Sequence, residues 1–391
     1  MSEAAHTPRL RFPEFSGEWE NEVVGNISNK VTDGTHDTPK PSSTGVPYIT
    51  AIHVKDGVID FDRCYYLSIE EHKKIYSRCN PEKNDILMVN IGAGTATTAL
   101  INIDYEFSLK NVALIKPNKL KSSSKFLVQS LRYKSGRLHH QLTSGGAQPF
   151  LSLKEIKRIK LNLPTKPEQQ KIADFLTAVD NKIEQLSKKQ ALLSEYKKGL
   201  MQQIFSQAIR FKADDGIEFP DWEEKKLGGV GRIRKGSQLN KSELTDTGDY
   251  PAINGGINPS GYTDKWNTGK NTITISEGGN SCGYINFITS KFWSGGHCYS
   301  IEELKGDVLN RFLFQYLKFN EHLIMRLRVG SGLPNIQKGE INNFKVNLPS
   351  LEEQTKISNF LSSIDSKIEQ VGGQLDESKQ FKKALLQQMF V

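Results

Sequence analysis

The chain contains one long segment twice. Residues 162–205 recur as residues 347–390 without a gap, at a constant offset of 185 positions (347 − 162 = 185). Within the segment, the tetrapeptide KIEQ at 182–185 returns at 367–370. Chance does not produce such a register over so long a stretch, so the chain is expected to fold as two copies of one unit.

The likeness extends upstream of this segment with a different offset. Trp19 and Gly25 match Trp222 and Gly228, which lie 203 positions further on (222 − 19 = 203), so the second copy is shorter inside by 18 residues (203 − 185 = 18). Each copy is therefore a long, variable body followed by a shared tail, unlike a solenoid of short repeats. A length of 391 residues also favours two domains over one. We expect a pseudo-twofold protein within a single chain.

Each tail has the pattern of a long helix. Thr165 with Glu168, and Ser350 with Glu353, have the spacing of a capping box. Apolar residues then recur at alternating intervals of four and three, as in a coiled-coil seam. The seam residues are Ile172, Leu176, Val179, Ile183 and Leu186 in the first tail, and Ile357, Leu361, Ile364 and Ile368 in the second.

Such a stripe on an isolated helix is also typical of a surface helix on its own domain. A helix of about 38 residues, however, extends about 57 Å, which is too long to bury its seam on one small body. We therefore expect the two helices to pack on each other in antiparallel orientation, as a rigid spacer between two bodies. The expected division is a domain at 1–161, a helix at 162–207, a domain at 208–346 and a helix at 347–391.

The two bodies have the pattern of irregular α+β domains. Short β-like runs are separated by Gly-rich turns and by one or two helical stretches. The expected strands lie at 48–52, 86–89, 112–115, 271–275 and 284–288, and the expected helices at 123–133 and 309–327.

Charge favours a polyanionic partner. There are 52 Lys and Arg against 44 Asp and Glu, for a net charge of +8. We find no apolar run of membrane-spanning length and no signal-peptide pattern in residues 1–15, so a cytoplasmic location without membrane association is expected. The four cysteines, which we interpret as reduced and mostly buried thiols, lack the spacing of a zinc knuckle or a redox pair.

The search for catalytic chemistry finds no complete motif. The Gly-rich run at 91–96 lacks the following helix and acidic residue of a dinucleotide site, and is more typical of a strand-to-strand loop. The acidic cluster at 221–225 has the wrong spacing for a nuclease core that binds Mg²⁺. His297 and Cys298 are neighbours on a predicted strand and point to opposite faces, which disfavours a thiol nucleophile. No catalytic residue and no metal site is predicted.

What remains is a set of Gly-punctuated polar loops that could contact nucleic acid, through backbone close to phosphate and side chains at base edges. Any one of them is more typical of an ordinary solvated turn, and the hypothesis depends on the ensemble. The candidates in the first copy are Lys30, Thr32, Asp33, Gly34, Thr35, His36, Asn90, Gly92, Gly94, Gly145, Gly146 and Gln148. Those in the second copy are Lys235, Gln238, Lys241, Asn254, Gly255, Gly256, Tyr262, Ser276, Glu277, Asn280, Ser281, Arg326 and Arg328.

The duplicated order resembles the specificity subunits of type I restriction-modification systems. The resemblance lies in the two tails, from Leu163-Pro164 to Phe205 and from Leu348-Pro349 to Phe390, which open with Glu168-Gln169 and Glu353-Gln354 and carry Asp180 and Asp365. It is supported by the openings at 11–15 and 210–211, the loop at 33–36, and the segments at 147–151 and 332–336. The bodies are similar to the target recognition domains of that family.

The resemblance implies a non-catalytic subunit that binds double-stranded DNA. Each recognition domain would read one half of a bipartite, asymmetric site, and the helices would set the gap and dock two modification subunits. Those subunits would carry S-adenosylmethionine and methylate adenine, and restriction subunits with ATP and Mg²⁺ could join them. A coiled-coil DNA-binding regulator or scaffold without enzyme partners stays open as an alternative, as does a stand-alone enzyme.

Overall fold

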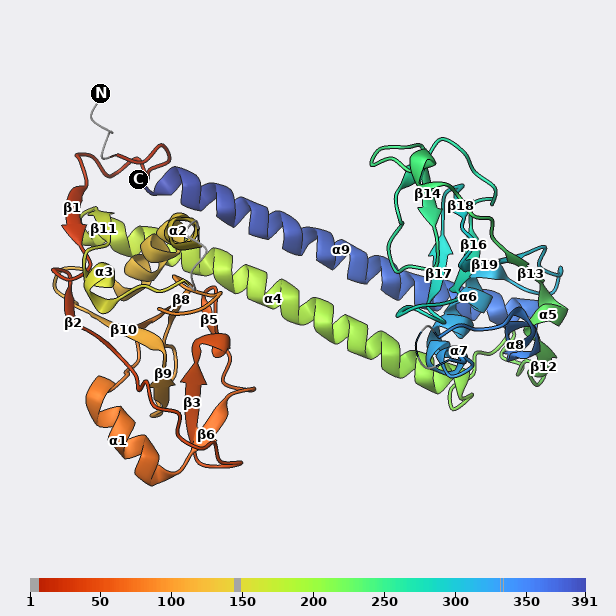
Figure 1. Ribbon diagram of the computed structural model, residues 1–391, viewed down its shortest axis with the longest axis horizontal. Helices are drawn as coiled ribbons and strands as arrows, with labels where there is room; N and C mark the ends of the chain where they lie inside the picture. Colours follow the sequence, from red (N-terminus) through yellow and green to blue (C-terminus); the bar gives the residue numbers. More distant parts are fainter. Residues whose placement is uncertain (1–6, 144–148, 331, 333) are drawn as a thin grey trace. The chain divides into compact units, whose positions relative to one another are not determined.

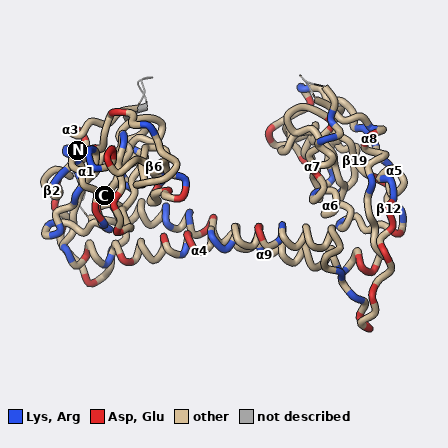
Figure 2. Tube along the Cα trace, turned by 90° about the horizontal axis from the view of Figure 1, so that it is seen from below, with Lys and Arg blue, Asp and Glu red and all other residues tan. Residues whose placement is uncertain are grey.

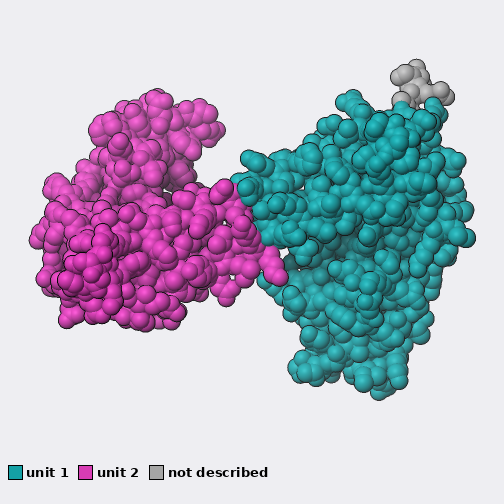
Figure 3. All heavy atoms as spheres, turned by 180° about the vertical axis from the view of Figure 1, so that it is seen from behind, with its two compact units in different colours: residues 1–187, 373–391 teal, residues 188–372 magenta. Residues whose placement is uncertain are grey.

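The computed structural model describes residues 7–143, 149–330, 332 and 334–391. The chain divides into two compact units, which Figure 3 distinguishes by colour. The first unit comprises residues 1–187 and 373–391, and the second comprises residues 188–372. Each long helix contributes residues to both units, and the units are described separately below.

The first unit is an α+β domain with the two helix ends packed on it (Figure 1). Its elements in chain order are β1 (Glu20–Val23), β2 (Ser28–Asp33), β3 (Val46–Thr50), the 3-10 turn η1 (Ala51–His53), β4 (Val54–Lys55), β5 (Val58–Ile59), β6 (Tyr65–Leu67), α1 (Ile69–Cys79), β7 (Ile86–Val89), β8 (Thr98–Leu100), β9 (Ser108–Lys110), β10 (Val112–Pro117), α2 (Ser124–Thr143), α3 (Leu153–Lys157), β11 (Lys160–Leu163) and the start of α4 (Lys166–Phe205).

The second unit repeats this plan without counterparts of α1 and of the β4–β5 hairpin in its described part. Its elements are β12 (Glu223–Lys226), α5 (Leu227–Val230), β13 (Arg232–Lys235), the 3-10 turn η2 (Lys241–Glu243), β14 (Tyr250–Ile253), β15 (Tyr262–Thr263), β16 (Thr272–Ser276), β17 (Ile285–Ile288), β18 (Trp293–Ser294), β19 (Cys298–Glu302), α6 (Asn310–Phe319), α7 (Glu321–Met325), α8 (Lys338–Asn343), β20 (Lys345–Leu348) and the start of α9 (Leu351–Met389).

The strand order is the same in both units. The four-stranded antiparallel sheet runs β2-β10-β7-β8 in the first unit and β13-β19-β16-β17 in the second. A three-stranded sheet runs β6-β3-β9 and β15-β14-β18, with the last pair parallel in both cases. The entry strand pairs Glu20 with Leu163 in the first unit and Glu223 with Leu348 in the second, which reproduces the offsets of 203 and 185 residue for residue.

The core of each unit lies between the four-stranded sheet and the helices. In the first unit, alternate sheet residues such as Met88 and Ile115 pack with Phe126 of α2, Leu176 of α4 and Phe390 at the end of α9. In the second unit, Ile273 and Ile301 pack in the same way with Phe312 of α6, Phe205 at the end of α4 and Leu361 of α9. Because the start of one long helix meets the end of the other in each unit, α4 and α9 run antiparallel.

The predicted fold class is therefore confirmed in its main elements: two copies of one α+β domain and two long antiparallel helices. The helices have 40 and 39 residues. Of the predicted seam, Ile172, Leu176, Leu186, Ile357, Leu361 and Ile364 are buried, whereas Val179, Ile183 and Ile368 are half-buried. None of the described helices is both long and apolar enough to cross a membrane.

Two local predictions need correction. The hydroxyl half of the predicted capping box is present at Ser350, which accepts from the amide of Glu353 (3.3 Å), whereas the Glu168 and Glu353 carboxylates are fully buried and accept hydrogen bonds from an arginine upstream, Arg11 or Arg210. The helix predicted at 309–327 is divided at Asn320, whose side-chain amide donates to the carbonyl of Tyr316 (2.9 Å) and competes with the helical backbone.

Candidate nucleic-acid interface

In the first unit, the end of strand β2 carries a buried carboxylate with two exposed partners. Asp33 is the last residue of β2, and its side chain is 7% exposed. Arg78, near the end of α1, donates from Nη2 to Asp33 Oδ1 (2.8 Å), and His36 Nε2 lies 2.9 Å from Oδ2. The side chains of Arg78 and His36 are 54% and 57% exposed, so both side chains reach solvent.

The loop that follows Asp33 is fixed by its own backbone. A Cβ on Gly34 would lie 2.0 Å from the carbonyl oxygen of Leu109, so only glycine fits here. Thr35 is buried, and its amide donates to the same carbonyl (2.9 Å). Thr32 is half-buried, and Lys30 donates to the carbonyl of Arg78 (2.9 Å). Gly34 and Thr35 therefore hold the loop in place, while Lys30 and His36 lie at its surface.

The Gly-rich run at 91–96 connects strands β7 and β8 in a hairpin, as the sequence favours. Asn90 is buried, and its side-chain Oδ1 has no hydrogen-bond partner among the described residues. Gly92 has a left-handed backbone (φ +94°) and donates to the carbonyl of Pro149, whereas Gly94 is exposed. The candidates Gly145, Gly146 and Gln148 lie outside the described residues.

In the second unit, a buried carboxylate again holds exposed partners at the end of the sheet. Glu277 directly follows β16, and its side chain is 10% exposed. Lys235, the last residue of β13, lies with Nζ 2.5 Å from Glu277 Oε1, and His297 Nδ1 lies 3.5 Å from Oε2. The hydroxyl of the buried Tyr299 donates to Oε1 (2.9 Å). Burial raises the pKa of Glu277, but hydrogen bonds from Lys235 and Tyr299 outweigh it and hold that pKa below its ordinary value.

Other predicted residues support this cluster. The hydroxyls of Ser276 and Ser281 both donate to the carbonyl of Gly255, and Asn254 Oδ1 accepts from the amide of His297 (3.1 Å). Gly255 has φ +85°, and a Cβ there would lie 2.4 Å from the carbonyl of His297. These residues therefore position His297 beside Glu277.

Several predicted residues lie apart from Glu277. Within the described part of the chain, none of these residues forms a hydrogen bond or an ion pair with the Glu277 carboxylate. Gln238 lies at the surface after β13, Lys241 in the turn η2 and Gly256 in the loop after β14. Tyr262 lies in strand β15, Asn280 in the β16–β17 turn, and Arg326 and Arg328 in the segment after α7.

The cysteines are buried and free, as expected. Burial raises the pKa of the Cys298 thiol to about 11, and its neighbour His297 faces Glu277. This arrangement does not activate a thiol nucleophile. No group of three metal-ligating side chains occurs among the described residues.

The comparisons with known proteins define the class. Residues 17–194 and 220–378 match the type I restriction modification DNA specificity domain, one match for each copy. The chain is thus a duplicated DNA-specificity-domain protein. It belongs to the family of type I restriction-modification specificity subunits.

Individual relatives agree with this assignment over most of the chain. The putative type I restriction enzyme MjaX specificity subunit of Methanocaldococcus jannaschii is 26% identical, with 95% of this chain and 93% of the relative covered. The MjaVIII specificity subunit of the same organism is also 26% identical, with 87% and 84% covered. The fold is similar to the crystal structure of a type I S subunit from M. genitalium, with a TM-score of 0.70, 19% identity and coverage of 98% and 99%.

The structure adds two residues that the sequence did not single out as DNA-binding candidates. Arg78 lies 45 positions from Asp33, on a helix that was not predicted, and no local motif connects them. His297 was considered only as a partner for Cys298. Both can be recognised only in the folded chain, where segments that are distant in sequence meet at the end of the four-stranded sheet.

Proposed function

We propose that this chain is the DNA sequence-specificity subunit of a type I restriction-modification complex, and that each recognition domain reads one half of a bipartite, asymmetric site. One observation carries this proposal: the two units have equivalent four-stranded sheets, and equivalent positions at the same end of these sheets carry different side chains. By strand register, Asp33 and Lys235 occupy equivalent positions beside Ala113 and Tyr299. Two copies of one fold would meet DNA in the same manner, and different side chains would select different base pairs.

The helices are the proposed ruler for the unread gap between the half-sites. Each unit ties them together with a charged pair, Lys382 with Asp180 in the first and Lys197 with Asp365 in the second. Lys residues are interspersed with Asp and Glu along both helices, while further Lys and Arg lie on the loops of each unit (Figure 2). Ion pairs between antiparallel helices favour one register, which a spacer of fixed length requires.

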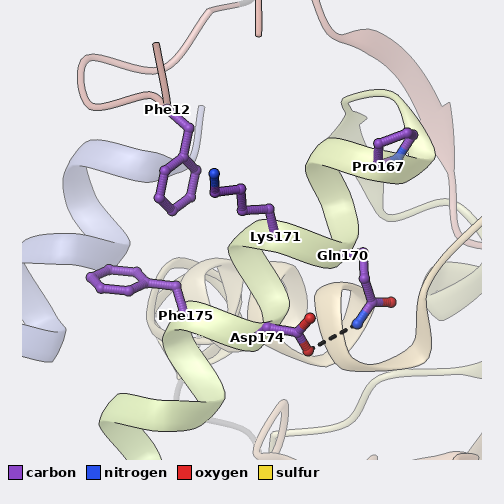
Figure 4. A pocket seen from close by; sticks show the side chains of 6 residues that line it. All are labelled: Phe12, Pro167, Gln170, Lys171, Asp174 and Phe175. Carbon is purple, nitrogen blue, oxygen red and sulfur yellow. Dashed lines mark hydrogen bonds between the residues drawn. The ribbon is translucent and has the colours of Figure 1, made fainter. Parts of the chain in front are cut away.

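We infer that the helix starts dock two modification subunits. At the start of α4, Phe12 and Phe175 form an edge-to-face pair (ring centroids 5.9 Å apart) beside a hollow that Lys171 and Pro167 also line (Figure 4). Phe211 and Phe360 form the matching pair (5.6 Å) at the start of α9. Two like aromatic surfaces in one chain suit two copies of one partner.

The chemistry is assigned to those partners. Adenine methylation requires a flipped base, S-adenosylmethionine and a catalytic pocket, which the modification subunits would supply. Restriction subunits would bring ATP and Mg²⁺, and this chain would contribute no catalytic residue and no cofactor. The proposed division stays at 1–161 and 208–346 for the recognition domains and 162–207 and 347–391 for the helices, and the proposed location is the cytoplasm.

Reconstitution tests this function. The purified chain is expected to bind duplex DNA in a salt-dependent manner and to transfer no methyl group, whereas addition of the modification subunit should give adenine methylation at one bipartite motif. DNA binding without any assembly with that subunit would favour the alternative, a coiled-coil DNA-binding regulator or scaffold. Methyl transfer by the chain alone would contradict the proposal.

A further inference from the structure

Each unit holds one exposed cation and one exposed histidine on a single buried carboxylate. In the first unit the carboxylate is Asp33, with Arg78 and His36. In the second it is Glu277, with Lys235 and His297. The same chemical constellation thus occurs twice, at the same end of the equivalent four-stranded sheets.

No other ion pair among the described residues combines a carboxylate that is at most 10% exposed with a cation that is more than half exposed. The remaining carboxylates that are at most 10% exposed are Glu168, Glu353 and Asp85, and they hold Arg11, Arg210 and Lys116. Those three cations are themselves only 16%, 23% and 15% exposed, as in ordinary structural pairs. Arg78 and Lys235 are more than half exposed, so their carboxylates position groups that remain open to a ligand.

The two constellations are built from different positions, which argues against mere inheritance of one structural pair. Helix α1, which the described part of the second unit lacks, brings Arg78 to Asp33. In the second unit the cation Lys235 occupies the position equivalent to Asp33, and the carboxylate Glu277 occupies the position equivalent to Asn90, since both precede the same hairpin turn. Two different solutions therefore give the same exposed chemistry.

The pairing indicates which DNA group the cations contact. A cation that binds phosphate acts through its charge, and a buried carboxylate beside it would cancel much of that attraction. The N–H groups of the cation that do not bond to the carboxylate can still donate hydrogen bonds to a ligand, and the pairing fixes their direction. Arg78 has five N–H donors and Lys235 has three, and each donates one hydrogen bond to its carboxylate. Guanine offers O6 and N7 acceptors in the major groove to such donors.

We propose that Arg78 and Lys235 are the guanine-reading side chains of the two half-sites, each held in its reading position by the carboxylate beneath it. The inference deepens the proposed function and depends on it. Asp33 and Glu277 act as positioning residues, which reduce the side-chain freedom that binding would otherwise have to remove. His36 and His297 lie beside the cations and contact the adjoining base.

The test compares variants of the full chain, each assembled with its modification subunit, by mapping methylated motifs across a genome. Arg78→Ala should relax one guanine position in one half-site by about tenfold to a hundredfold and leave the other half-site unchanged. Lys235→Ala should do the same in the opposite half-site. Asp33→Asn and Glu277→Gln, which keep the shape, should relax the same positions to a smaller degree.

Matched controls lie on the same elements. Lys74 on α1 and Arg232 on β13 are exposed cations paired with exposed carboxylates, and their replacement by Ala should leave the motif intact. An unchanged motif in Arg78→Ala or Lys235→Ala would overturn the inference, as would equal weakening at every sequence, which indicates a phosphate contact. A native motif with no G·C pair in a half-site would also overturn it. If the native chain directs no motif at all, the proposed function itself fails.

Discussion

Asp180 on α4 accepts a hydrogen bond from Lys382 on α9, and 185 positions further on Asp365 accepts one from Lys197, with the roles of the two helices exchanged. The two pairs differ in their surroundings. Asp180 also accepts hydrogen bonds from Gln129 (2.8 Å) and Arg132 (3.2 Å). Arg132 in turn forms a bidentate salt bridge with Asp56 (2.7 Å for both hydrogen bonds). A charge network therefore connects the helices to the first recognition domain, whereas Asp365 has only Lys197 as an ion-pair partner among the described residues.

This difference predicts unequal effects of two matching substitutions. Asp180→Ala removes the acceptor shared by Lys382, which is 7% exposed, and Arg132, which is 9% exposed, and should lower the free energy of unfolding by about 2 kcal/mol or more. Asp365→Ala leaves only the 22%-exposed Lys197 and should cost about 1 kcal/mol or less. Urea titrations of both variants check this, and equal losses would contradict the account of the network.

The buried arginine–glutamate pairs at the helix starts give a second prediction. Arg11→Met leaves the fully buried Glu168 without its cation and should destabilise the first unit by about 3 kcal/mol. Arg210→Met should do the same to the second unit through Glu353. Lys171→Ala is the control, because its partner Glu14 is 44% exposed and such pairs contribute about 0–1 kcal/mol. A loss in the control as large as in Arg11→Met would argue against the importance of burial.

The pKa of Glu277 predicts a pH dependence of stability. Because this pKa is lower in the folded chain than in the unfolded one, the contribution of Glu277 is complete above the ordinary value of 4.5 and is lost as the pH falls through the lowered folded value. Glu277→Gln should therefore flatten the loss of stability below pH 4.5. Chemical unfolding of both proteins between pH 3 and 7 measures this, and identical slopes would mean that Glu277 contributes nothing to it.

The ruler is tested by lengthening both helices together. Gln190 on α4 faces Gly372 on α9, where a Cβ would lie 2.7 Å from the Gln190 amide nitrogen. Insertion of one heptad after each residue keeps the seam in register and adds about 10 Å, which corresponds to about three base pairs. The unread gap should lengthen by that amount with both half-sites unchanged. A motif with the original gap would remove the helices from this role.

Much of the fold could be predicted because the constraint is local and periodic. The offset between Trp19 and Trp222 predicted that the two copies correspond residue for residue, as the strand pairings after these tryptophans show, and the spacing of Leu176 and Leu361 predicted the long helices. Helix α1 was missed because its apolar face is short, with only His72, Ile75 and Cys79 buried.

The candidate site was less predictable because its members meet only through the sheet. The carboxylates Asp33 and Glu277 were among the candidates, but their partner Arg78 comes from a helix whose position no sequence pattern fixes. Gly34 was predicted to let backbone approach phosphate. In the structure, the side of Gly34 that would carry a Cβ lies against the carbonyl of Leu109. Turn glycines serve folding and binding with the same sequence signal.

The most direct test of the central claim is genome-wide mapping of adenine methylation in cells with and without this chain, with the modification subunit present in both. We expect one motif with two unlike halves and a fixed unspecified gap, which disappears when the chain is removed. Methylation that is unchanged by its removal, or confined to one continuous motif, would contradict the claim that two unlike domains each read half of the site.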